Sequence, residues 1–103
     1  MTDDLEKYEE PLAAEYESLS QETLEYRLTL FIKELLQNDF AKLTNMIYRH
    51  DVNEHKFNIA LEEPSVDLQA RAVALLVIER ELQKIETRKK YSRKNKPTLP
   101  PLS

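Results

Sequence analysis

The sequence predicts an all-α protein: a small three- to four-helix bundle with a long C-terminal helix and charged flexible ends. Glycine is absent from all 103 residues, so tight β-hairpin turns lack their usual residue. Leu, Glu, Lys and Ala are abundant, and apolar residues recur at helical spacing. We expect one domain with an acidic arm (1–19), a helical bundle (20–90) and a basic, proline-containing disordered tail (91–103).

The acidic arm carries Tyr and Leu residues at a roughly helical spacing, which Pro11 interrupts. We therefore expect a mobile arm that contains at most one or two helical turns. Side chains such as Tyr16 and Leu19 would attach those turns to the bundle.

Four helices are predicted in the bundle, at 20–38, 39–50, 53–62 and 65–90. Each begins at a residue whose side chain can cap it, namely Ser18 or Ser20, Asp39, Asn53 and Ser65. The first helix has one apolar stripe, made of Leu24, Leu28, Phe31, Ile32, Leu35 and Leu36. The next two helices should turn a smaller apolar set inward: Phe40, Leu43, Met46, Ile47, Phe57, Ala60 and Leu61.

The last helix has two apolar faces. One has nearly heptad spacing and consists of Leu68, Leu75, Ile78, Leu82 and Ile85. The opposite face consists of Val66, Ala70, Val73 and Val77. Either this is the central helix of the bundle, covered by the first helix on one side and by the second and third on the other, or one face binds a partner helix or a second copy. For the second hypothesis we expect the opposite face to be an exposed partner-binding patch.

Charge is distributed unevenly along the chain. Residues 1–22 contain eight acids and one base, whereas residues 88–96 contain six bases and no acid. The basic segment predicts a salt-dependent contact with nucleic acid, in which one aromatic ring could stack on a base. Its residues are Arg88, Lys89, Lys90, Tyr91, Arg93, Lys94 and Lys96. The two charged ends could also neutralise each other.

Composition argues against several classes of protein. Cysteine is absent, which excludes disulfides and thiolate metal sites and favours a reducing compartment. The N-terminus is acidic and lacks the pattern of a signal peptide, and no apolar run approaches the 18 residues of a membrane span. We expect a cytoplasmic protein with no membrane contact.

Catalysis is not expected. Without glycine there is no phosphate-binding loop or dinucleotide fingerprint, and the serines occupy cap or tail positions. His50 and His55 lie near two acids, but their spacing matches no metal motif, and a solvated turn explains them. We therefore predict no catalytic residue, cofactor, metal or small-molecule substrate. A metal-dependent activity at these histidines remains a third hypothesis.

The function expected from these patterns is that of a non-catalytic protein–protein interaction or adaptor module that self-associates. The alternative is a nucleic-acid or ribosome-associated protein that binds through the basic segment.

Overall fold

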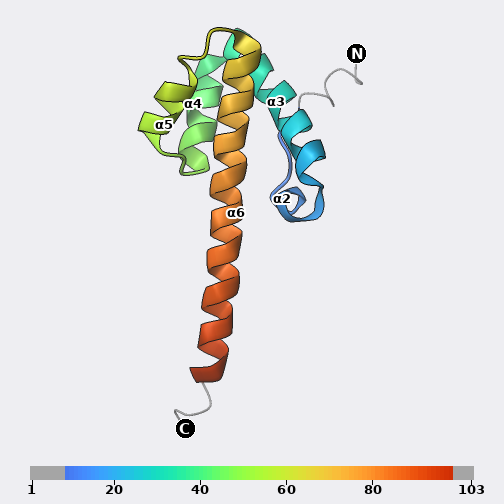
Figure 1. Ribbon diagram of the computed structural model, residues 1–103, viewed down its shortest axis with the longest axis vertical. Coiled ribbons are helices and arrows are strands. Elements are labelled where there is room, and N and C mark those ends of the chain that lie inside the picture. The colour runs from blue at the N-terminus through green and yellow to red at the C-terminus, as the bar shows by residue number, and fades with distance from the viewer. Residues whose placement is uncertain (1–8, 99–103) are drawn as a thin grey trace.

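The computed structural model describes residues 9–98, which form five α-helices and no strand (Figure 1). The helices are α2 (Glu15–Ser18), α3 (Gln21–Asn38), α4 (Phe40–Arg49), α5 (Glu54–Ala60) and α6 (Val66–Thr98). The all-α prediction is confirmed. None of the described helices combines the length and the apolar character that crossing a lipid bilayer requires.

The four main helices begin where their cap residues predict. The Ser20, Asp39 and Asn53 side chains accept hydrogen bonds from the backbone N–H three residues later, at 3.2, 3.1 and 3.0 Å. The Ser65 hydroxyl likewise accepts from the backbone N–H of Leu68 at 3.2 Å. Each cap satisfies a donor that the first helical turn cannot pair internally.

The core lies between α3 and the N-terminal half of α6, with α4, α5 and α2 completing it (Figure 1). The predicted stripe of α3 is buried except for Leu36, which is partly buried against the core. The α4 and α5 contributions are Leu43, Met46, Ile47, Phe57 and Ala60. The α6 contributions are Ala70, Val73, Ala74, Val77, Ile78 and Ile85.

The described part of the acidic arm is attached to the bundle through Tyr and Leu side chains, which corrects the expectation of a flexible end there. Tyr16 on α2 is only 3% exposed, Leu19 packs against the core, and α2 contacts α6. Residues 9–19 are therefore part of the folded body. Residues 1–8 lie outside the described part of the chain.

α6 is longer than predicted, since it continues to Thr98 and includes residues 91–98 that we expected in a disordered tail. No glycine or proline interrupts the chain between Ser65 and Lys96, so nothing local ends the helix before Pro97. Its last turns extend beyond the other helices (Figure 1). The radius of gyration, 16.6 Å, accordingly exceeds the ~13 Å of a compact domain of similar length. The tail prediction for residues 99–103 concerns residues outside the described part.

The prediction for Phe40 was wrong. Its side chain is 47% exposed, because it is the first residue of α4 and lies at the edge of the core. Its ring stacks on that of Phe57, with centroids 6.3 Å apart.

Candidate functional site

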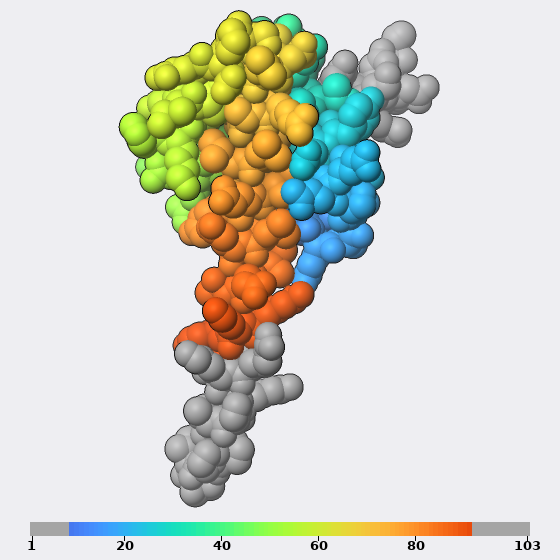
Figure 2. Space-filling view, viewed as in Figure 1, coloured from blue at the N-terminus to red at the C-terminus, as the bar shows by residue number. Residues whose placement is uncertain are grey.

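Three leucines of α6 remain exposed after the helices have packed, and we call Leu68, Leu75 and Leu82 the leucine stripe. Their exposed fractions are 47%, 37% and 39%. Successive members are seven residues apart, about two helical turns, so they share one side of α6. In Figure 2, α6 forms the middle of the visible face, between the α4–α5 side and the α2–α3 side.

The expected partner-binding patch is not exposed, which corrects the prediction made from the sequence. Ala70, Val73 and Val77 are completely buried in the chain's own core, and Val66 is half-buried. This side of α6 therefore lies in the core. The hypothesis of a central helix covered on both sides holds only in part, because the leucine stripe stays exposed.

The heptad-spaced face is divided between core and surface. Ile78 and Ile85 are buried, whereas the leucine stripe is exposed. The stripe carries charges of both signs on its flanks. Arg71 is exposed and lies 3.7 Å from a carboxylate oxygen of Glu25, measured from Nη2. Glu79 is exposed and has no ion-pair partner among the described residues.

A second apolar surface lies between α4 and α5. It is a groove of ≈520 Å³ whose walls include Phe40, Ile47, Tyr48, Phe57 and Leu61. Tyr48 is 87% exposed. No residue that lines the groove belongs to α6, so a probe at Tyr48 can distinguish the groove from the leucine stripe.

The basic segment continues α6 as a helix. Arg88, Lys89, Lys90 and Tyr91 are exposed, and Tyr91 is 65% exposed. The side chains of Arg93, Lys94 and Lys96 lie outside the described part of the structure. Lys89 Nζ lies 2.9 Å from a carboxylate oxygen of Glu17 on α2, so one ion pair joins the acidic arm to the basic segment.

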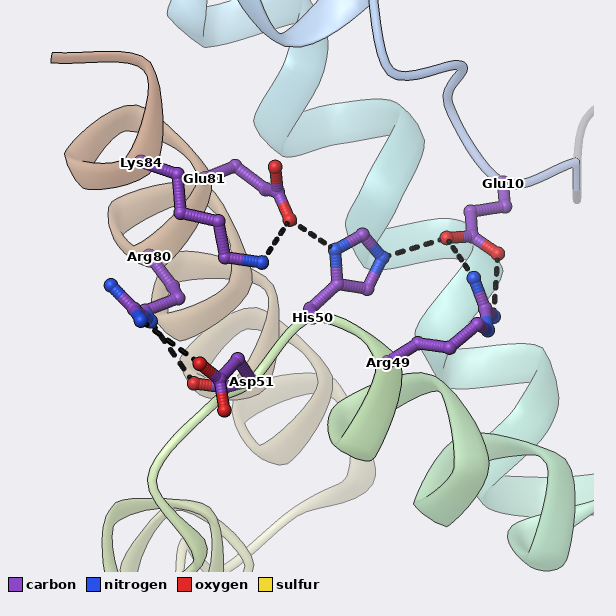
Figure 3. A network of polar contacts seen from close by, with 7 residues as sticks. All are labelled: Glu10, Arg49, His50, Asp51, Arg80, Glu81 and Lys84. Carbon is purple, nitrogen blue, oxygen red and sulfur yellow. Dashed lines mark hydrogen bonds and ion pairs between the residues drawn. The ribbon is translucent and has the colours of Figure 1, made fainter. Parts of the chain in front are cut away.

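His50 occupies the centre of a charge network that sequence reasoning missed (Figure 3). It is the C-cap of α4, followed by Asp51 at a φ of 62°. The backbone N–H groups of Asp51 and Val52 donate to the carbonyls of Tyr48 and Ile47, at 3.1 Å each. This is the Schellman arrangement, in which an aspartate replaces the usual glycine. It holds His50 at the junction of α4, α6 and the arm.

Both ring nitrogens of His50 meet a carboxylate (Figure 3). Nδ1 lies 2.6 Å from Glu81 Oε2 on α6, and Nε2 lies 2.8 Å from Glu10 Oε2 in the arm. Arg49 donates to both oxygens of Glu10 at 3.1 and 3.4 Å, and Lys84 donates to Glu81 at 3.2 Å. When His50 is protonated, each carboxylate contacts two cationic groups. The two carboxylates therefore stabilise the imidazolium form.

The pKa values of the network favour its charged form. The hydrogen bond from His50, helped by Arg49, lowers the pKa of Glu10 to about 2 despite partial burial. Burial opposes ionisation of Glu81, but its hydrogen bonds to His50 and Lys84 still lower its pKa. Burial also opposes the charge on His50, yet the two carboxylates raise its pKa above 6.5.

Tyr16 is a buried side chain that lies beside the network. Its ring lies 5.9 Å from that of His50, and burial, together with the nearby carboxylates, raises the pKa of its hydroxyl. That hydroxyl is buried and has no hydrogen-bond partner among the described residues. The network therefore lies beside the core, with one polar atom unsatisfied.

The geometry corrects the prediction of a solvated turn at the histidines. His50 is 9% exposed, while His55 is exposed on α5. Glu10 and Glu81 bind opposite nitrogens of one ring, so they do not converge on one point as metal ligands would. Within residues 9–98 no cluster of three His, Asp or Glu side chains is arranged to hold a metal ion.

No family model, no curated protein and no solved structure matches this chain.

Proposed function

We propose that this protein is a non-catalytic interaction module that binds a helix through the leucine stripe. One observation carries the proposal: Leu68, Leu75 and Leu82 lie in line on α6 and remain 37–47% exposed after the bundle has formed. Leucines at seven-residue spacing on an exposed helical face are typical of helix pairing. A second helix lying along α6 would remove these side chains from water, which is favourable in proportion to the apolar area covered.

The state of Glu10 argues against its acting as a general base. A general base near neutral pH needs a pKa close to the working pH. Glu10, whose pKa is lowered to about 2, is far below that range, and its oxygens already accept from His50 and Arg49. The absence of cysteine supports a reducing compartment such as the cytoplasm for this interaction.

Site-specific photo-crosslinking in living cells tests the proposal. A photoreactive phenylalanine analogue replaces Leu75 in one version of the full chain and Tyr48, in the α4–α5 groove, in another. We expect covalent adducts from position 75 and none from position 48. Adducts from position 48 alone would move the binding surface to the groove, and a lack of adducts from either position would also overturn the proposal.

A second candidate function is supported by the length of α6. Because α6 continues to Thr98, the basic segment is presented on a helix that projects past the body (Figure 1). The exposed Arg88, Lys90 and Tyr91 could contact the phosphates and one base of a single-stranded nucleic acid.

The test compares two double variants of equal net charge, Arg88→Gln/Lys90→Gln and Lys42→Gln/Lys56→Gln. Binding of a labelled single-stranded RNA is measured at several salt concentrations. Only the first variant should weaken binding and reduce its dependence on salt, by roughly one unit of log–log slope per lost phosphate contact. Equal effects of both variants, or binding that ignores salt, would argue against a specific contact at this segment.

A further inference from the structure

The leucine stripe and its flanking charges are arranged symmetrically about Leu75. Leu68 and Leu82 each lie seven residues from Leu75, and Arg71 and Glu79 each lie four residues from it. At a rise of ~1.5 Å per residue, the outer leucines are ~10.5 Å and the two charges ~6 Å from Leu75 along the helix axis. If α6 is turned end for end about Leu75, Leu68 and Leu82 exchange places. Arg71 and Glu79 exchange places as well.

On the basis of the proposed function, we propose that the helix bound by the leucine stripe is α6 of a second copy, in antiparallel orientation with a two-fold axis at Leu75. In this arrangement each Leu68 lies level with the other copy's Leu82, and the two Leu75 side chains meet on the axis. Each Arg71 then lies level with the Glu79 of the other copy. The interface is isologous, so both copies use one surface.

Charge decides the orientation. In a parallel pair every residue lies level with its own copy, which would place Glu79 beside Glu79 and Arg71 beside Arg71. Like charges at an interface are unfavourable, whereas the antiparallel pair brings opposite charges together. Both groups are exposed, although Arg71 also lies 3.7 Å from Glu25 of its own chain. The Arg71 side chain is 62% exposed, and Glu79 has no ion-pair partner among the described residues.

The chain contains no cysteine, so introduced cysteines report the orientation directly. Three versions of the full chain carry Leu68→Cys, Leu75→Cys or Leu82→Cys and are mildly oxidised after circular dichroism has confirmed that they fold. The antiparallel pair predicts a rapid disulfide dimer from Leu75→Cys alone, and another when Leu68→Cys and Leu82→Cys are mixed. Leu68→Cys alone and Leu82→Cys alone should remain largely uncrosslinked. Efficient crosslinking of each of these two with itself would show a parallel pair and overturn the inference.

Charge reversal provides an independent test that leaves the leucines intact. The full-length wild type, Arg71→Glu and Glu79→Arg are compared by sedimentation equilibrium up to about 1 mM protein. Each single variant places like charges at both symmetric positions, so its dissociation constant should rise roughly tenfold. A mixture of the two variants restores an opposite-charge pair at both positions and should return to wild-type affinity. Failure of the mixture to recover would contradict the pairing.

The two proposals can fail separately. If the wild type stays monomeric throughout this range while the photoreactive group at position 75 attaches to a different protein in cells, the second copy is excluded and the interaction function stands. If no adduct forms and no dimer is detected, both proposals fall.

Discussion

Glu10 and His50 are 40 residues apart in the chain, yet a Glu10 carboxylate oxygen lies 2.8 Å from His50 Nε2. The other ring nitrogen of His50 meets Glu81 on α6. One imidazolium therefore joins the arm, the end of α4 and the long helix. We therefore expect the stability of the fold to depend on pH through the groups that meet at this junction.

The stability should depend on pH through His50 and Glu10. Because folding raises the pKa of His50, its contribution is fully present below its ordinary pKa of 6.5 and is lost as the pH rises through the higher folded value. Folding lowers the pKa of Glu10, so its contribution is present above 4.5 and is lost as the pH falls toward about 2. From these two groups, urea unfolding at a series of pH values should show the highest stability between about pH 4.5 and 6.5.

His50→Gln should remove the alkaline part of this dependence. A glutamine cannot supply a positive charge to both carboxylates, so the free energy of unfolding near pH 6 should fall by about 1–3 kcal/mol. The other histidine is a matched control, because His55 is exposed and lies outside the network. His55→Gln should retain the wild-type curve. Equal curves for His50→Gln and the wild type would show that the network does not stabilise the fold.

Two substitutions of Tyr16 should separate the contribution of its ring to stability from that of its hydroxyl. The hydroxyl is buried without a hydrogen-bond partner among the described residues, so Tyr16→Phe should leave stability unchanged or raise it by up to about 1 kcal/mol. Tyr16→Ala should lower stability by about 3–5 kcal/mol, because it removes a buried ring. Thermal and urea unfolding measure both effects. A clear loss of stability in Tyr16→Phe would mean that the hydroxyl has a stabilising partner.

Two positions three residues apart on α6 should respond very differently to truncation. Ile78 is 2% exposed, so Ile78→Ala should cost about 2–5 kcal/mol. Leu75 is 37% exposed, and Leu75→Ala should cost about 1 kcal/mol or less when measured at a protein concentration low enough to avoid association. Similar losses at the two positions would contradict the assignment of Leu75 to the surface.

The stability of the protein should depend on which residue replaces Asp51. Its φ of 62° lies in the left-handed region, and its backbone carbonyl and carboxylate accept hydrogen bonds from Arg80 at 3.1 and 3.0 Å. Asp51→Ala should cost about 1–2 kcal/mol, because alanine tolerates this φ poorly and removes the carboxylate. Glycine adopts a positive φ without steric cost, so the stability of Asp51→Gly should stay within about 0.5 kcal/mol of the wild type. Equal losses in the two variants would show that the backbone conformation contributes little.

The sequence alone determined the features that depend on neighbouring residues. Ser20, Asp39, Asn53 and Ser65 cap the helices as predicted, because a cap needs only a backbone N–H three residues later. The buried face of α3 was also predictable, because that helix has only one apolar face that can turn toward the core. The predicted end of α6 was wrong because the three prolines of residues 91–103, and the lack of an apolar pattern there, were interpreted as disorder. The first of these prolines is Pro97, and no glycine or proline lies within α6 before it.

The tertiary structure alone decided which face of α6 is buried and what surrounds His50. α6 has two apolar faces, and its sequence does not decide which of their side chains the other helices cover. The core contains Ala70, Val73 and Val77 from one face and Ile78 and Ile85 from the other, and the leucine stripe stays at the surface. Glu10 and Glu81 are 40 and 31 residues from His50 in the chain, and no pattern among neighbouring residues predicts their contact with it. It exists only because three separately formed segments meet at one point.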